Sequence, residues 1–413
     1  MKIPIMRLLL IAVLPSSVLH FGCAAEDPPI EQPAEQPAVS RRVVRPDHFP
    51  ADRPYSFGVL TGDTLYLAGQ VGQDPVTGQQ ANGIGDQTRQ AMENVGHVLK
   101  AAGMDFTNLV KCHVYLNDMD DYTGMNAVYG KFFSERVPAR TTVEADGLPA
   151  DASIEISCVA YRDSSRISVV SVPKGSLPAP LGPYSPAVWA GDTLYLSGMG
   201  GQFPEDRRLP EALTEQTTQT LVNIGTTLET AGLGFSHLVD SNVYVTTPDE
   251  VGTLAGAYAP SFASMPAPPR GLVLLPRLPG EIKTEITVVA ARRTDERQII
   301  AAADDADDPT RGMRVRGTLY TRTESAPEAG PDFEQQFRGV LRKLESTLTN
   351  ASLRWRDVAH VEVYLADIAD MDGMNRVFRE TFPEQPPART TLQTTPRSGE
   401  RVQAALVATR AQM

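Results

Sequence analysis

The chain has 413 residues, of which 41% are hydrophobic and 21% are charged, and its formal net charge is −12 at pH 7. This composition is typical of a folded globular protein, and the length leaves room for two to four domains. Because an acidic surface repels phosphate backbones, the charge argues against nucleic acid as a general partner.

The first 23 residues have the features of a bacterial export signal. Lys2 and Arg7 lead into a short apolar run over 8–14, and Gly22 and Cys23 follow. The run is too short to span a bilayer but has the length of a signal-peptide core. A glycine before a cysteine is typical of a lipoprotein signal, which predicts lipid attachment at Cys23. The alternative is an ordinary cleaved signal with an incidental cysteine.

Both alternatives predict an exported protein, in the periplasm or on the outer surface. The lipoprotein signal adds a lipid anchor as its one contact with a membrane. Residues 24–40 are rich in Pro, Glu, Gln and Ala. Such a segment buries too little apolar surface to offset its chain entropy, so we expect a solvated tether.

The rest of the chain repeats itself three times. One marker, GDTLYLAG at 62–69, returns at 191–198 and in reduced form at 317–320. A second marker lies at 109–116, 238–245 and 358–365, and a third, PARTT or its variants, at 138–142, 268–272 and 387–391. Three markers in the same order predict a triplication, which we divide into repeats over 41–163, 164–293 and 294–413.

Each repeat is predicted to alternate strands and helices. In the first, a strand over 64–68 precedes a helix that carries apolar residues at helical spacing from Ala91 to Ala102 and stops at Gly103. A strand over 110–116, a second helix over 125–133, and strands over 140–145 and 153–162 follow. This order predicts an α/β unit with a mixed sheet and two helices on one face.

Two cysteines, Cys112 and Cys158, lie in the first repeat. An oxidising compartment permits a disulfide between them. The alternative is a pair of buried free thiols that act as small hydrophobic side chains.

Several motifs resemble those of the RidA family (YjgF, enamine/imine deaminases) from about residue 41 to the end. These are GPYSPA at 182–187, QTRQA at 87–91, NAVY at 126–129, PART at 138–141 and IEI at 154–156. The resemblance implies chorismate-mutase-like subunits that form a homotrimer with ligand clefts between neighbours. Here the three units are joined, so we expect one chain to fold as an intramolecular pseudo-trimer and to be a monomer in solution.

The resemblance also implies the site residues: an arginine that binds the carboxylate of a 2-imino acid and a glutamate that positions water, with no metal and no cofactor. A guanidinium can bind a carboxylate through two parallel hydrogen bonds. Mapped onto this chain, the catalytic residues are Arg140, Glu155, Arg270 and Glu285, and the substrate-binding residues are Tyr55, Asn126, Tyr184, Asn375 and Arg389.

The repeats depart unequally from this pattern. Ala255 replaces the asparagine in the second repeat, and Gln403 replaces the glutamate in the third, which also lacks the Gly-Pro-Tyr-Ser segment. We therefore expect a cleft centred on Arg140 and Glu155 to be the most complete, and Arg389 to matter least. Surface ion pairing for the arginines and core packing for the tyrosines are the alternatives.

The leading function is hydrolytic deamination of a small reactive imine or enamine that carries a carboxylate. The alternative is a non-catalytic module that binds a small carboxylate, which export favours because the enzymes that release imines are mainly cytosolic. An endoribonuclease is least favoured, since the chain is acidic and exported.

Overall fold

The computed structural model describes residues 41–302 and 309–410. The predicted signal, the lipid site at Cys23 and the tether lie outside the described residues. Within the described ranges, no helix combines the length and the apolar character needed to cross a membrane.

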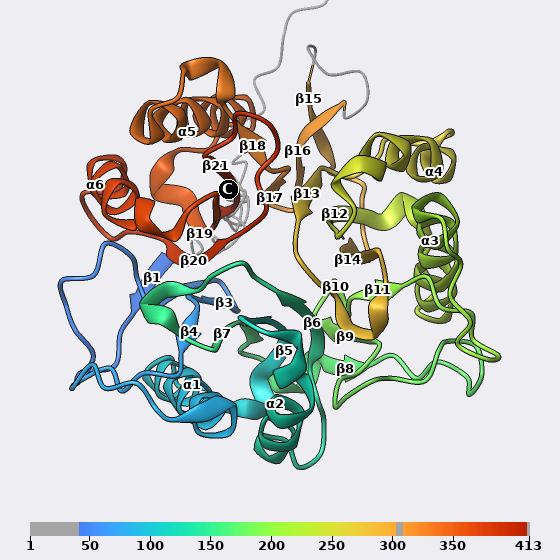
Figure 1. The fold of residues 1–413 in the computed structure, drawn as a ribbon, viewed down its shortest axis with the longest axis horizontal. Helices are drawn as coiled ribbons and strands as arrows, with labels where there is room; N and C mark the ends of the chain where they lie inside the picture. The colour runs from blue at the N-terminus through green and yellow to red at the C-terminus, as the bar shows by residue number, and fades with distance from the viewer. Residues whose placement is uncertain (1–40, 303–308, 411–413) are drawn as a thin grey trace, which may run out of the picture. The chain divides into compact units, whose positions relative to one another are not determined.

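The first repeat forms a seven-stranded sheet with the order β1-β2-β3-β7-β5-β6, and β4 pairs with β7 (Figure 1). Only β5 and β6 run parallel, so the sheet is mixed, as predicted. Its elements are β1 (Arg41–Val44), β2 (Gly58–Thr61), β3 (Thr64–Leu67), β4 (Gln70–Val71), α1 (Gly83–Ala101), β5 (Leu109–Leu116), α2 (Tyr122–Tyr129), β6 (Ala139–Glu144) and β7 (Ile154–Tyr161).

The second and third sheets repeat this topology. The second contains β8 (Ile167–Val169), β9 (Ala187–Ala190), β10 (Thr193–Leu196), β11 (Met199–Gly200), α3 (Leu213–Thr230), β12 (Leu238–Val245), α4 (Leu254–Tyr258), β13 (Arg270–Leu274) and β14 (Thr284–Ala291). The third contains β15 (Gln298–Ala301), β16 (Thr310–Val315), β17 (Thr318–Thr321), β18 (Glu324–Ser325), α5 (Phe333–Asn350), β19 (Val358–Leu365), α6 (Met371–Thr381), β20 (Ala388–Gln393) and β21 (Val402–Thr409).

Two details of the first repeat differ from the sequence prediction. The second helix ends at Tyr129 and continues as a 3₁₀ turn over Gly130–Phe132, so it is shorter than expected. The edge strand β1 and the two-residue strand β4 were not predicted, because short strands carry too few residues to show an alternating pattern.

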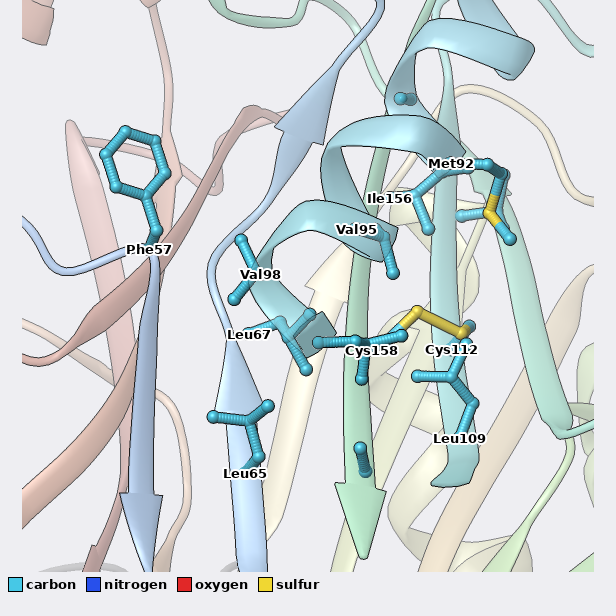
Figure 2. Close-up of a cluster of buried hydrophobic side chains, with 14 of the residues drawn as sticks. Phe57, Leu65, Leu67, Met92, Val95, Val98, Leu109, Cys112, Ile156 and Cys158 are labelled. Atoms are coloured by element: carbon cyan, nitrogen blue, oxygen red, sulfur yellow. A yellow bond between two sulfur atoms is a disulfide. The ribbon is translucent and has the colours of Figure 1, made fainter. Parts of the chain in front are cut away.

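The core of the first repeat lies between α1 and its sheet (Figure 2). Met92, Val95 and Val98 are fully buried because they recur on the one face of α1 that packs against β7. Cys112 and Cys158 lie directly opposite each other on β5 and β7 and form a disulfide. The structure therefore has the disulfide and not the pair of free thiols.

The three repeats contact one another in pairs. Gly198 of the second repeat donates its N–H to the Arg140 carbonyl of the first (3.0 Å). Gly69 of the first donates to the Arg389 carbonyl of the third (3.1 Å). The N–H of Leu272 in the second donates to Oγ1 of Thr323 in the third (3.2 Å). Each repeat thus meets both others, and the chain is an intramolecular pseudo-trimer.

Candidate active site

Arg140, near the start of β6, is held rigidly at the junction of the first and second repeats. Its side chain is buried, and Nη2 donates to the Tyr122 hydroxyl at 3.1 Å. The guanidinium carbon lies 5.0 Å from the ring centre of Tyr129 and 5.3 Å from that of Tyr184, which belongs to the second repeat. Aromatic faces attract a cation, so the rings fix the guanidinium without neutralising it.

The chain of the second repeat passes directly over this arginine. A Cβ atom at Gly182 would lie 2.6 Å from Asn126 Oδ1 and 2.7 Å from Arg140 Nη2, so only glycine allows the approach. Asn126 Oδ1 is buried and has no hydrogen-bond partner within the described ranges. A buried amide oxygen without a partner is costly, which is consistent with a ligand that donates to it.

Glu285, on β14 of the second repeat, completes what we call the Arg140 cleft. A cavity of about 520 Å³ is lined by Arg140, Tyr122, Tyr184 and Glu285 among others. Burial raises the pKa of Glu285 to about 7, although Lys111, the Thr142 N–H and Arg140 act in the opposite direction. A carboxyl with this pKa can both give and accept a proton near neutral pH.

Lys111 lies behind the Arg140 cleft and was missed by the sequence analysis. Its buried ammonium donates to Thr141 Oγ1 (2.7 Å), the Leu196 carbonyl (2.7 Å) and Thr287 Oγ1 (2.8 Å), which come from both repeats. Burial lowers the pKa of Lys111 to about 7. The sequence did contain a signal for Lys111, which lies within the otherwise apolar strand LVKCHVYL. A charge on a buried strand needs hydrogen-bond partners, and this predicts a polar site beside it.

A second arginine–glutamate junction, which we call the Arg389 cleft by analogy, joins the third repeat to the first. The guanidinium of Arg389 lies 5.0 Å from the ring of Tyr55 and 4.9 Å from that of Phe378. Burial raises the pKa of Glu155 to about 8, opposed by the Thr391 N–H and by Arg389. Asn375 occupies on α6 the position that Asn126 has on α2.

Three buried polar atoms of the Arg389 cleft have no hydrogen-bond partner among the residues that the structure describes. They are Arg389 Nη1, Asn375 Oδ1 and Glu155 Oε2. A donor and two acceptors left unpaired in one cleft fit a small polar ligand. The expectation that Arg389 lacks partners and matters least is therefore not supported, because its partners come from the first repeat.

The expected cleft centred on Arg140 and Glu155 is wrong. Arg140 on β6 lies opposite Cys112 of β5, whereas Glu155 on β7 lies opposite Tyr115. The two side chains are thus separated by three residues along β5, about 10 Å, and by two strand spacings across it, about 10 Å. Arg140 instead meets Glu285 of the second repeat, and Arg389 meets Glu155 of the first.

Both clefts depend on a glycine that faces the glutamate, a feature the sequence analysis did not use. A Cβ at Gly198 would lie 1.8 Å from Glu285 Oε1, and one at Gly69 would lie 1.6 Å from Glu155 Oε1. The signal was present in the repeats, since both glycines end the marker at 62–69 and 191–198, and Thr323 stands at this position in the third repeat.

The third junction, the Arg270 cleft between the second and third repeats, is built differently. Arg270 is buried and lies 5.2 Å from the ring of Tyr258, but Ala255 stands where the asparagine would be. Gln403 replaces the glutamate, and its Nε2 donates to Glu400 Oε2 at 2.7 Å. An amide cannot accept a proton from water, so Gln403 cannot act as the general base that Glu285 and Glu155 can be in the other two clefts.

Thr323 takes over the structural role of the missing carboxylate. In the Arg140 and Arg389 clefts, the N–H groups of Thr142 and Thr391 bond to the glutamate. In the Arg270 cleft, the equivalent N–H of Leu272 bonds to Thr323 Oγ1 instead. The backbone donor is therefore satisfied without a glutamate.

Among the described residues, no group of three or more His, Cys, Asp or Glu side chains is placed to hold a metal ion. The two complete clefts each offer a buried guanidinium for an anion and a carboxyl that titrates near neutrality. This arrangement suits acid–base chemistry on a small carboxylate.

Comparison with known proteins places each repeat among small single-repeat proteins. The family model described as Endoribonuclease L-PSP matches residues 46–162, 175–292 and 311–398. The chain is 46% identical over 111 residues to a RutC family protein of Pyrococcus horikoshii, covering 27% of this chain and 88% of that protein. It is 43% identical over 124 residues to human 2-iminobutanoate/2-iminopropanoate deaminase, covering 30% and 90%. A solved structure, the YjgF gene product of E. coli, is 35% identical and covers 29% and 98%, with a TM-score of 0.28.

Proposed function

The chain belongs to the Endoribonuclease L-PSP family, which includes the RidA proteins, and on this basis we propose that it hydrolyses small 2-imino acids to 2-oxo acids and ammonia. The observation that carries the proposal is the pairing of a buried arginine with a buried glutamate across a cleft. This pairing occurs twice, as Arg140 with Glu285 and as Arg389 with Glu155.

In the proposed reaction, the guanidinium of Arg140 binds the substrate carboxylate and so directs the C=N bond toward Glu285. The ionised Glu285 accepts a proton from water as the water oxygen attacks the imine carbon. The same carboxyl then gives this proton to the nitrogen, which forms a carbinolamine. It next transfers the proton of the new hydroxyl to the nitrogen as the C–N bond breaks and the C=O bond forms, and ammonia and a 2-oxo acid leave. Water is the only co-reactant, and no electrons change hands.

The neighbouring side chains support this role. Asn126 Oδ1 offers an unpaired acceptor for the imine N–H, and the Tyr184 ring packs on the guanidinium. Burial excludes bulk water from Arg140, which strengthens its hold on an anion. The Arg389 cleft carries the same set through Asn375, Tyr55 and Glu155.

The test is ammonia release from an imine generated in situ by an amino-acid oxidase, measured against a blank without the protein. We expect release faster than the blank, and its loss in the double variant Arg140→Ala/Arg389→Ala. Arg293→Ala, which removes an arginine whose side chain is 59% exposed, is the matched control and should change nothing.

The competing function, a binding module without catalysis, predicts a different result. Ammonia release would then match the blank, while a 2-oxo acid, a stable mimic of the substrate, would still bind in calorimetry. RNA cleavage by the purified chain, lost in the same double variant, would favour an endoribonuclease instead.

We also propose that the chain is exported, on the basis of its signal-like first 23 residues. We further propose that it is a monomer, since its three repeats already satisfy one another's junctions. Light scattering should give the mass of one chain. A species of three chains would contradict the proposal.

A further inference from the structure

The segment that leads to Tyr184 is longer than its counterpart in the first repeat. Val44 pairs with Gly58 at the start of the strand pair, and Val170 bonds to the equivalent Ala187. From Val170 to Tyr184 the chain takes fourteen steps, whereas it takes eleven from Val44 to Tyr55. The second repeat thus has three additional residues beside the Arg140 cleft.

The two segments also take different paths. In the first repeat, Phe49 is 3% exposed and packs against Phe57 at 4.8 Å, which ties the segment to the core of its own repeat. The second segment has no aromatic residue between Val170 and Tyr184. Its Val172 and Leu177 pack against the core of the second repeat, and the segment as a whole forms one wall of the Arg140 cleft.

This wall makes the cleft apolar beyond its catalytic end. Arg140 and Glu285 form the polar end, and the rest of the cavity of about 520 Å³ is mainly apolar. The apolar groups from the segment face others from β11 and the loop before β14; together they are Val172, Leu177, Pro178, Leu181, Met199 and Ile282.

Two cations also border the cavity but do not reach its polar end. Lys174 is exposed on the segment, and Arg207 Nη1 already donates to the Ala179 carbonyl. Neither is a buried, unpaired charge of the kind that binds a second carboxylate. The apolar wall therefore dominates the region where a substrate side chain would lie.

We propose that the Arg140 cleft selects 2-imino acids with a large apolar side chain, such as those derived from leucine, methionine or phenylalanine. This inference rests on the proposed function and adds the substrate class. The carboxylate would bind Arg140, the imine carbon would face Glu285, and the side chain would fill the space under Leu177 and Leu181.

The test uses two variants, in each of which only one cleft keeps its glutamate and can hydrolyse imines. Glu155→Gln leaves the Arg140 cleft with its glutamate, and Glu285→Gln leaves the Arg389 cleft with its own. For each chain, kcat/KM is measured for the imines of leucine and alanine generated in situ. Because apolar pockets discriminate by about tenfold or more per missing methylene group, we expect the leucine-to-alanine ratio to be at least about tenfold higher in the Glu155→Gln chain.

A variant in the wall locates the preference. In the Glu155→Gln background, Leu177→Asp should lower kcat/KM for the leucine imine about tenfold and change the alanine imine less than about twofold. Leu177 is half-buried and packs against the core of the second repeat, so a thermal melt of the variant checks its folding, and the alanine imine reports on the intact catalytic groups. Val76→Asp, at an apolar side chain that is 65% exposed and outside the cleft lining, should alter neither value.

Equal ratios in the two single-cleft chains would overturn the inference and leave the proposed function intact. A preference of the Glu155→Gln chain for the imine of glutamate would also overturn it, and would assign selection to Lys174 and Arg207. If no imine is hydrolysed, the proposed function fails. Calorimetry with 4-methyl-2-oxopentanoate and pyruvate then decides the inference, which requires tighter binding of the former and is overturned by equal affinities.

Discussion

The Arg140 and Arg270 clefts are built from equivalent strands and an equivalent buried arginine, yet only the first has a glutamate at the position of Glu285. They differ where Gly198 faces Glu285 in one and Thr323 replaces the glycine in the other. Because a Cβ at Gly198 would collide with the carboxylate, a threonine there excludes a glutamate in that position. The threonine hydroxyl also takes the backbone N–H that the carboxylate would have bound.

This comparison explains how a site can be lost without loss of the junction. Gln403 is not a single defect, since Thr323 and Ala255 change with it. In a homotrimer each sequence change appears in all three clefts. Joining the repeats in one chain lets one junction become structural while two keep their complete sets.

The largest expected effect comes from removing both bases. The double variant Glu155→Gln/Glu285→Gln makes the Arg140 and Arg389 clefts resemble the Arg270 cleft, so ammonia release should fall at least about 100-fold, the usual contribution of a general base. Steady-state rates against the blank measure it. Activity within a few fold of the parent chain would mean that the glutamates are not the bases.

A smaller effect is expected from Gly198→Ala, which brings a Cβ to within 1.8 Å of Glu285 Oε1. Displacing the carboxylate should silence the Arg140 cleft alone, so total turnover should fall by the share of that cleft, about half for a substrate that both clefts hydrolyse equally. Gly256→Ala, where a Cβ would meet no atom within 4 Å, is the control. Unchanged turnover in Gly198→Ala would disprove the proposed need for glycine.

The smallest effect concerns pH. A base must be ionised, so activity should rise as pH increases through the pKa of the glutamate. Burial raises that pKa to about 7 for Glu285 and to about 8 for Glu155. The Glu155→Gln chain should therefore reach half-maximal kcat/KM about one pH unit below the Glu285→Gln chain. Coincident profiles, or the reverse order, would contradict this assignment.

Much of the fold was predictable because the triplication repeats the same apolar pattern three times. Apolar positions at helical spacing placed α1, and short β-branched runs placed β5 and β7. Two strands were not predicted: β4 has only two residues and shows no period, and β1 begins with two arginines and lies outside the repeated markers. The disulfide stayed undecided, because only the register places Cys112 opposite Cys158.

The site was predictable in its residue types but not in its pairing. The motifs indicated Arg140, Glu155, Glu285 and Arg389, and the resemblance implied clefts between neighbours, yet the expected cleft combined Arg140 and Glu155 of one repeat. Which arginine meets which glutamate depends on how repeats pack, and no local pattern records it. Lys111 was missed for the same reason, since its acceptors come from two repeats.

Each complete cleft combines an arginine of one repeat with a glutamate of another repeat, and two double variants test this pairing directly. Arg140→Ala/Glu285→Gln removes two groups from one cleft, so the release due to the Arg389 cleft should remain, about half when the clefts contribute equally. Arg140→Ala/Glu155→Gln damages both clefts, so release should fall at least about tenfold. The reverse result, with about half the activity left in Arg140→Ala/Glu155→Gln and almost none in Arg140→Ala/Glu285→Gln, would contradict the pairing.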